Sequence, residues 1–212
     1  LRQVFPEIGR LTCYARASTL WALKEAGIRQ LAEAGLNRVH LGLESGEPEL
    51  LRFHRKGQRP ETVIAACRWL KDAGIEVSCY ILLGMGGHDR WEAHADATAQ
   101  VVTAIDPEFA RLRRLWIYGG EGAGPESPLW AAIREATFVP QTPEGTVREL
   151  RRFIERLGDV HTRIVCDHAN NYLRVEGTMP HDRARMLEAI DTFLALPEAE
   201  RVARYEMMAS TI

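Results

Sequence analysis

The sequence predicts an α/β fold, a partial (βα) barrel of mostly parallel strands with a helical C-terminal extension. Two stretches indicate this fold, LAEAGLNRVHLGLE at residues 31–44 and LKDAGIEVSCYILLG at residues 70–84. Each reads as a helix end, an Ala-Gly stop and a strand, and Gly35 and Gly74 suit the left-handed residue that closes a helix. The two glycines are 39 residues apart, which fits one strand, one helix and two loops. Units of this kind join parallel strands through helical crossovers.

The individual elements of the N-terminal part follow from spacing and from start signals. The helix at 60–73 is the clearest, because Val63, Cys67 and Leu70 follow helical spacing and Pro60 suits the first helical position. The other segments expected here are helices at 18–34 and 89–104, and strands at 11–16, 37–43, 76–83 and 109–117.

After Tyr118 the sequence changes character. We expect a Gly- and Pro-rich loop at 119–128, a helix from Thr142 to Leu157, a strand-like segment at 160–166 and an amphipathic helix at 180–196. We therefore assign residues 1–118 to the C-terminal part of the barrel. Residues 119–212 form the mainly helical extension.

Composition limits the classes of partner and compartment. The 212 residues are 46% hydrophobic and carry 27 basic against 29 acidic side chains, so no net field attracts nucleic acid or an anionic membrane. The four cysteines are too irregularly spaced for a zinc ribbon and too few for a secreted disulfide scaffold. No apolar run of about 18 residues is present. We expect a soluble, cytoplasmic protein.

Polar residues gather where the predicted strands end. In βα barrels the carboxyl ends of the strands meet at one rim, where the loops converge. The residues expected at this rim are a guanidinium, a carboxylate, a hydroxyl, a phenol and a flexible turn, supplied by Arg16, Glu44, Ser45, Tyr80 and Gly84. This set suits a polar, zwitterionic or ribose-bearing small molecule.

These residues lie in motifs that resemble a known family. RVHLGLESGEPELLRFHRKG at 38–57 and AACRWLKDAGIEVSCYILLGMGG at 65–87 resemble the second half of the radical S-adenosylmethionine (SAM) barrel, in the branch whose fourth strand ends in Glu-Ser-Gly. The resemblance covers roughly residues 10–118. Residues 167–191 resemble the tail of bacterial iron–sulfur oxidoreductases of this group.

The resemblance implies a cofactor set and a reaction. In such enzymes a 4Fe-4S cluster, reduced by a donor such as ferredoxin or flavodoxin, cleaves SAM to a 5′-deoxyadenosyl radical that abstracts hydrogen from the substrate. By similarity, Glu44 would hold the ribose or the methionine end of SAM, and Lys56 would pair with its carboxylate. Arg16 and Gly84 match residues that end the neighbouring strands. Tyr80 stands where relatives place a polar residue, and Ser45 shares the Glu-Ser-Gly motif.

One family motif is absent from this sequence. The cluster is carried by a CxxxCxxC loop, whereas no two cysteines here are closer than Cys67 and Cys79. Three sulfurs must surround one cube, and single spaced cysteines do not replace that loop. We therefore expect the chain to be part of a longer protein, inactive alone, with cluster ligands upstream of Leu1. An open barrel edge would favour a homodimer.

Each assigned residue also has an ordinary structural interpretation. Ser45 could cap the helix that follows it, with Glu44 at its start. Lys56 could be a solvated cation at a helix end, and Arg16 could bridge to an acid on a neighbouring strand. His40 reads as a core histidine, although it would meet the substrate if it pointed into the barrel.

Other functions remain open on the sequence alone. Cys166-Asp167-His168 suggests a zinc triplet, but adjacent strand residues alternate faces and strain such a chelate. A non-redox binding or scaffold module with a barrel-like fold is the main alternative, since it needs no cluster. A barrel aldolase or lyase would want a Schiff-base lysine within a strand, and the predicted strands hold none.

Overall fold

The computed structural model describes residues 4–118 and 127–209. Its N-terminal elements are β1 (Thr12–Ala15), α1 (Ala17–Glu33), β2 (Arg38–Glu44), α2 (Pro48–Phe53), α3 (Pro60–Asp72), β3 (Glu76–Leu83), α4 (Gly87–Ile105) and β4 (Phe109–Arg114). The later elements are α5 (Pro128–Arg134), α6 (Pro143–Arg156), β5 (Arg163–Cys166), β6 (Val175–Thr178), α7 (Arg183–Leu194) and α8 (Glu198–Ala209). Most of the loop expected at 119–128 lies outside the described residues.

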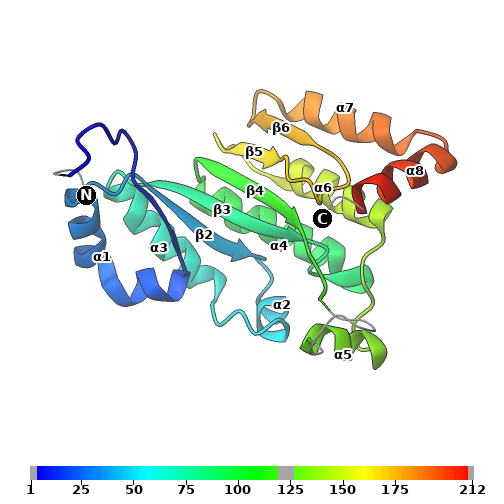
Figure 1. The fold of residues 1–212 in the computed structure, drawn as a ribbon, viewed down its shortest axis with the longest axis horizontal. Coiled ribbons are helices and arrows are strands. Elements are labelled where there is room, and N and C mark those ends of the chain that lie inside the picture. The colour runs from blue at the N-terminus through cyan, green and yellow to red at the C-terminus, as the bar shows by residue number, and fades with distance from the viewer. Residues whose placement is uncertain (1–3, 119–126, 210–212) are drawn as a thin grey trace.

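The strands form one six-stranded sheet in sequential order from β1 to β6. Neighbours from β1 to β5 are parallel, and β6 alone runs antiparallel to β5. Helices α1, α3, α4 and α6 follow one another along one face of this sheet (Figure 1). The predicted class, an α/β fold of mostly parallel strands, is confirmed.

Side-chain alternation explains which face the helices cover. Along β2, the residues Val39, Leu41 and Leu43 are fully buried in the core, together with Cys79 and Ile81 of β3. The residues between them point to the opposite side, because successive strand side chains alternate. We call this opposite side the open face of the sheet. Its residues are more polar and carry the site.

The chain after residue 118 adds strands as well as helices. β5 pairs in parallel with β4, and β6 returns beside β5 through a loop of eight residues, 167–174. The helix expected at 142–157 is α6, and it packs between α4 and α7. The sheet therefore continues from the barrel part into the extension.

Local signals explain several boundaries and correct one. Gly35 and Gly74 have positive φ angles of 91° and 75° and close α1 and α3, as their sequence context predicts. Helix α2 is capped by Glu47, whose carboxylate accepts from the backbone N–H of Leu50 at 2.7 Å. Ser45 was a candidate for this cap, but its hydroxyl accepts from the N–H of Glu47 at 3.0 Å, before the helix begins at Pro48.

Candidate functional site

Glu44 ends β2 in an unusual backbone conformation. Its φ angle is 64°, in the left-handed region that costs a residue with a side chain roughly 1 kcal/mol. The register of β2 against β3 shifts between Gly42 and Glu44. A Cβ atom on Gly42 would lie 2.5 Å from Oε1 of Glu44, so the missing side chain leaves room for the carboxylate. The carboxylate is thereby turned back over the open face.

Two cations share a recess with this carboxylate. The recess has a volume of about 240 Å³ and is lined by Ala15, Arg16, Gly42, Glu44, Lys56 and Gln58. Nζ of Lys56 lies 3.9 Å from Oε1 of Glu44, and Nη2 of Arg16 donates to the carbonyl of Lys56 at 3.4 Å. The structure thus brings together three of the predicted residues, Arg16, Glu44 and Lys56.

Gln58 belongs to this recess and was missed by the sequence analysis. Its Nε2 donates to the carbonyls of Gly42 at 2.9 Å and Leu43 at 3.0 Å, which ties the loop after α2 to the end of β2. Its only sequence signal was its place directly after Lys56 and Gly57. No pattern distinguishes such a residue from an ordinary loop glutamine.

Burial and a neighbouring positive charge act in opposite directions on the pKa of the acid in the recess. Burial raises the pKa of Glu44, and the positive charge of Lys56 opposes this shift. The Glu44 side chain is 22% exposed and that of Lys56 is 32% exposed. A separation of 3.9 Å is longer than a hydrogen bond, so both groups keep capacity for a ligand. An acceptor beside two donor cations suits a molecule that bears amino or hydroxyl groups together with a carboxylate.

Ser45 lies behind the recess, fully buried. Its hydroxyl donates to Nδ1 of His94 at 2.8 Å, and Nε2 of His94 donates to the carbonyl of Leu82 at 3.0 Å. Burial lowers the pKa of His94 to about 4, so the ring is neutral and accepts at Nδ1. Ser45 therefore anchors the end of β2 to α4 rather than lining the recess.

Gly84 is held from the opposite end of the same network. It has a φ angle of 84°, and its N–H donates to both carboxylate oxygens of Glu149 on α6, at 2.9 and 3.1 Å. Oε1 of Glu149 lies 3.4 Å from Nε2 of His94. Burial raises the pKa of Glu149 to about 8. The chain Ser45–His94–Glu149–Gly84 thus links the ends of β2 and β3.

Gly84 and Tyr80 therefore take different places from the other predicted residues. Gly84 lines a separate recess of about 290 Å³ with Arg114, Trp116 and Tyr172 among its neighbours. Tyr80 lies in register with Gly42, on the open face and before the end of its strand. Its hydroxyl is 3.3 Å from that of Tyr14.

His40 corrects the expectation of a core histidine. It stacks on Tyr14 on the open face, with ring centroids 4.9 Å apart. Burial lowers its pKa, and the charges of Arg111 and Arg38 add to the shift. His40 thus takes the orientation that the sequence analysis set second, toward the barrel interior.

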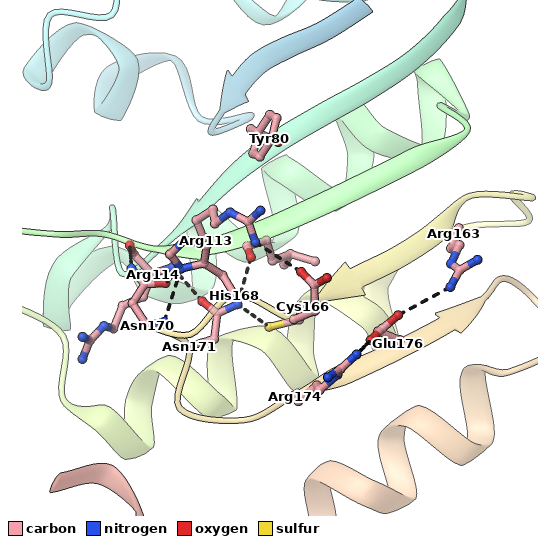
Figure 2. Close-up of polar contacts among 12 residues, drawn as sticks. Tyr80, Arg113, Arg114, Arg163, Cys166, His168, Asn170, Asn171, Arg174 and Glu176 are labelled. Atoms are coloured by element: carbon pink, nitrogen blue, oxygen red, sulfur yellow. Dashed lines mark hydrogen bonds and ion pairs between the residues drawn. The ribbon is translucent and has the colours of Figure 1, made fainter. Parts of the chain in front are cut away.

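The triplet Cys166-Asp167-His168 does not converge on one point (Figure 2). Cys166 is buried on the helix side and accepts from Asn171 at 3.2 Å, while Asp167 faces Arg113 at 3.3 Å. His168 contacts Asn170 at 2.5 Å. No group of three His, Cys, Asp or Glu side chains that could hold a metal occurs among the described residues.

The loop that contains this triplet clamps the end of β4. Oδ1 of Asn171 accepts from the N–H of Arg114 at 2.9 Å, and Nδ2 of Asn170 donates to the carbonyl of Arg114 at 3.2 Å. A second donation from Asn171 reaches the carbonyl of Leu112 at 3.0 Å. The amides satisfy backbone groups of β4 beyond the residues that pair with β5, as Figure 2 shows.

The acid and the two bases gather near the carboxyl ends of parallel strands, where βα barrels place their small-molecule sites. Residues 2–99 match the family model described as the radical SAM superfamily. This match supports membership of the chain in the superfamily. Members use SAM and a 4Fe-4S cluster, act as enzymes and take electrons from donors.

Curated relatives match parts of the chain. The tRNA uridine(34) acetyltransferase of Methanocaldococcus jannaschii is 38% identical over 65 residues, which are 31% of this chain and 12% of that protein. The biotin synthase of an Arthrobacter species is 35% identical over 102 residues, 47% of this chain and 27% of that protein. The chain thus spans about an eighth to a quarter of the length of these relatives.

Solved structures support the fold. Elp3 of Methanocaldococcus infernus, with residues 1–46 deleted, aligns with a TM-score of 0.59 and 21% identity, covering 87% of this chain and 41% of that one. The radical SAM methyltransferase TsrM of Kitasatospora setae, with tryptophan and a SAM analogue bound, aligns at 0.51 and 16% identity over 79% and 40%. No described helix is long and apolar enough to cross a bilayer.

Proposed function

We infer that this chain carries the SAM-binding second half of the barrel of a radical SAM iron–sulfur oxidoreductase. The single observation that carries this inference is the Glu44 carboxylate, which is turned over Gly42 into a recess with Arg16 and Lys56. Residues 1–118 would supply this part of the barrel. Residues 119–212 would form an extension that supports it through α6.

The residues of the recess fit one end of SAM. The Glu44 carboxylate would accept from the ribose hydroxyls or the amino group, while Lys56 and Arg16 would pair with the carboxylate. Ser45 and Gly84 would hold the strand ends rather than touch the ligand, and Tyr80 would face the substrate. Bound beside a reduced cluster, SAM would supply the chemistry for abstracting hydrogen from the substrate.

The cluster has no matching residues in the described part of the chain. Cys13 is exposed, whereas Cys67, Cys79 and Cys166 are buried, and these residues form no three-thiolate group. We therefore expect the isolated chain to be inactive. The ligands of the cluster would come from the rest of the protein, and ferredoxin or flavodoxin would supply the electrons in the cytoplasm.

The proposal is tested with the protein encoded by the whole gene, reconstituted anaerobically with iron, sulfide and a reductant. We expect 5′-deoxyadenosine to form from SAM. Glu44→Gln keeps the size of the side chain but removes its charge, so we expect a loss of about 2 kcal/mol of binding, or roughly a 30-fold higher KM for SAM. Glu49→Gln is the control, because that side chain is 61% exposed on α2.

Two outcomes would contradict the proposal in different ways. If no deoxyadenosine forms and the whole reading frame contains no CxxxCxxC, the enzyme assignment is wrong. If Glu44→Gln behaves like Glu49→Gln while deoxyadenosine forms, the enzyme assignment stands but the role of Glu44 does not. Both readouts come from the same assay.

A non-redox binding module is the second candidate, and the missing thiolate group favours it. Such a module would form no 5′-deoxyadenosine, whatever amount of iron and sulfide is used for reconstitution. A barrel aldolase has less support, because no described strand contains a lysine.

We also propose a homodimer through β1, which pairs only with β2 in the described sheet. An unpaired strand edge recruits a further strand. Light scattering of the 212-residue chain should give twice the mass of 23.9 kDa. A monomer at all concentrations would rule this out.

A further inference from the structure

Three aromatic rings form a continuous platform on the open face. Tyr14 of β1, His40 of β2 and Tyr80 of β3 lie on neighbouring strands, with ring centroids 4.9 Å apart for Tyr14 and His40 and 6.0 Å for the two tyrosines. His40 and Tyr80 are 5.9 Å apart. The core residues of the same strands all point to the helix side. The Tyr14 ring is 29° from parallel to His40 and 26° from parallel to Tyr80, whereas His40 and Tyr80 are tilted by 52°. Tyr14 is 76% exposed and offers a ring face on which a planar ligand stacks.

An unmatched positive charge borders this platform. Arg111 of β4 lies in register with Tyr80, and it forms no ion pair with any described residue. Its Nε is buried without a hydrogen-bond partner, as is Nδ1 of His40. A buried donor without an acceptor is costly, so an anionic group placed there would satisfy it.

The next arginine of β4 on the open face already has an acid. The Arg113 guanidinium lies 5.4 Å from the Tyr80 ring and 3.3 Å from Asp167. Further along the sheet, Glu176 lies between Arg163 and Arg174, as Figure 2 shows. Arg111 is therefore the arginine beside the rings that has no acid partner among the described residues.

The platform also adjoins the recess that holds Glu44. Gly42 lies between His40 and Glu44 on the same face of β2 and in register with Tyr80. Having no side chain, Gly42 puts no barrier between the rings and the recess. A ligand that stacks on the platform would therefore border the proposed SAM site.

We propose that this platform binds the substrate, and that the substrate is a small planar ring compound bearing an anionic group. The ring stacks on Tyr14 and Tyr80, and the anion pairs with Arg111. That the ligand is a substrate rests on the proposed function. The binding surface itself is defined by its own residues. A phosphate and a carboxylate are both suitable anions for a guanidinium.

The test uses the 212-residue chain, shown to be folded by thermal unfolding, and ligand-observed NMR titrations. The probes are thymidine 5′-monophosphate with both features, thymidine with the ring alone and ribose 5-phosphate with the anion alone. We expect the monophosphate to bind at least 10-fold more tightly than either part. A fourth probe, 2-naphthoate, shows whether a carboxylate replaces the phosphate. This comparison uses only the native chain, so it does not depend on whether any variant folds.

Variants then assign the two halves of the site. Arg111→Gln should weaken the monophosphate about 10-fold and leave thymidine unchanged, whereas Tyr80→Leu should weaken both. Arg174→Gln is the control, since this arginine directly precedes β6 and pairs with Glu176 at 2.6 Å. Glu49→Gln, at an exposed position on α2, should also leave monophosphate binding unchanged. The readout is binding by the isolated chain and needs no SAM cleavage, which separates this proposal from the SAM assignment.

Several results would overturn the proposal. One is that neither the monophosphate nor naphthoate binds the folded chain. Another is that ribose 5-phosphate binds as tightly as the monophosphate, because the rings would then contribute nothing. Equal weakening by Arg111→Gln and Arg174→Gln would show only a general effect of charge.

Discussion

Gly46→Ala should destabilise the protein by about 3 kcal/mol or more, although the change adds a single methyl group. A Cβ on Gly46 would overlap the carbonyl oxygen of Ala97 and lie 2.7 Å from Cα of Thr98. These are backbone atoms of α4, which cannot turn away as a flexible side chain would. The chain must shift there, and it would strain the hydrogen bond from the Gly46 N–H to Oγ1 of Thr98 at 2.9 Å.

Urea unfolding of the variant and of a matched alanine substitution measures this effect. Gly9→Ala is the control, because a Cβ there meets nothing within 4 Å and Gly9 has no positive φ angle. Gly46 also lacks a positive φ angle, so the loss is steric and not conformational. Equal unfolding midpoints for the two variants would show that β2 and α4 do not approach this closely.

As the pH rises above 6.5, the native protein should become less stable, whereas the Glu149→Gln variant should not. Burial raises the pKa of Glu149 to about 8, far above its ordinary value of 4.5. A group of this kind stabilises the fold below its unfolded pKa, and that contribution is lost as the pH rises through the folded pKa. Between pH 6.5 and 8.5 we expect the native protein to lose on the order of 2 kcal/mol.

The titration of His94 limits the pH range in which the effect of Glu149 on stability can be measured alone. The pKa of His94 is lowered from 6.5 to about 4, so its contribution is present above 6.5 and is lost as the pH falls toward 4. Between 4.5 and 6.5 the two residues act in opposite directions. Above 6.5 only Glu149 of this pair titrates.

Unfolding free energies of the native chain and Glu149→Gln at pH 6.5, 7.5 and 8.5 check this prediction. The unfolding free energy of the variant should increase relative to that of the native chain as the pH rises, since glutamine resembles the protonated acid and does not ionise. Glu188→Gln, at an exposed position on α7, should follow the native profile. Parallel profiles for the native chain and Glu149→Gln would mean that Glu149 is ionised throughout, paired with a charged His94.

The elements with regular local patterns were predicted well. The strand expected at 76–83 is β3 with the same limits, and the helix expected at 60–73 is α3, one residue shorter. Pro60, the apolar spacing and the stop at Gly74 lie within one short stretch of chain. Such signals act over a few residues and need no partner from elsewhere.

The elements without a local signal were missed. The strand β6 has four residues, and its pairing with β5 depends on partners across a loop. Helix α8 was not expected either, and its sequence is polar on average. Tyr205 of this helix is nevertheless buried and contacts Tyr172 and Phe193. The contacts that stabilise it come from distant segments.

The candidate site divides in the same way. Glu44 and Lys56 could be nominated from a strand end and from a motif, and the structure places them in one recess with Arg16. Ser45 and Gly84 were nominated alongside them, but each is held from behind by a buried partner on another helix. Neither His94 nor Glu149 carries a sequence signal that connects it to these glycine and serine positions.

The amino-acid order by itself determined the alternation of strands and helices, the parallel sheet and the carboxylate at the end of β2. Those features depend on periodicity, turn residues and the rule that parallel strands end at one rim. Only the tertiary structure decided that His40 faces the rings of Tyr14 and Tyr80, and that Glu149 reaches Gly84 across 65 residues. Such contacts join segments far apart in the chain, and they arise from the packing of α4 and α6 on the sheet.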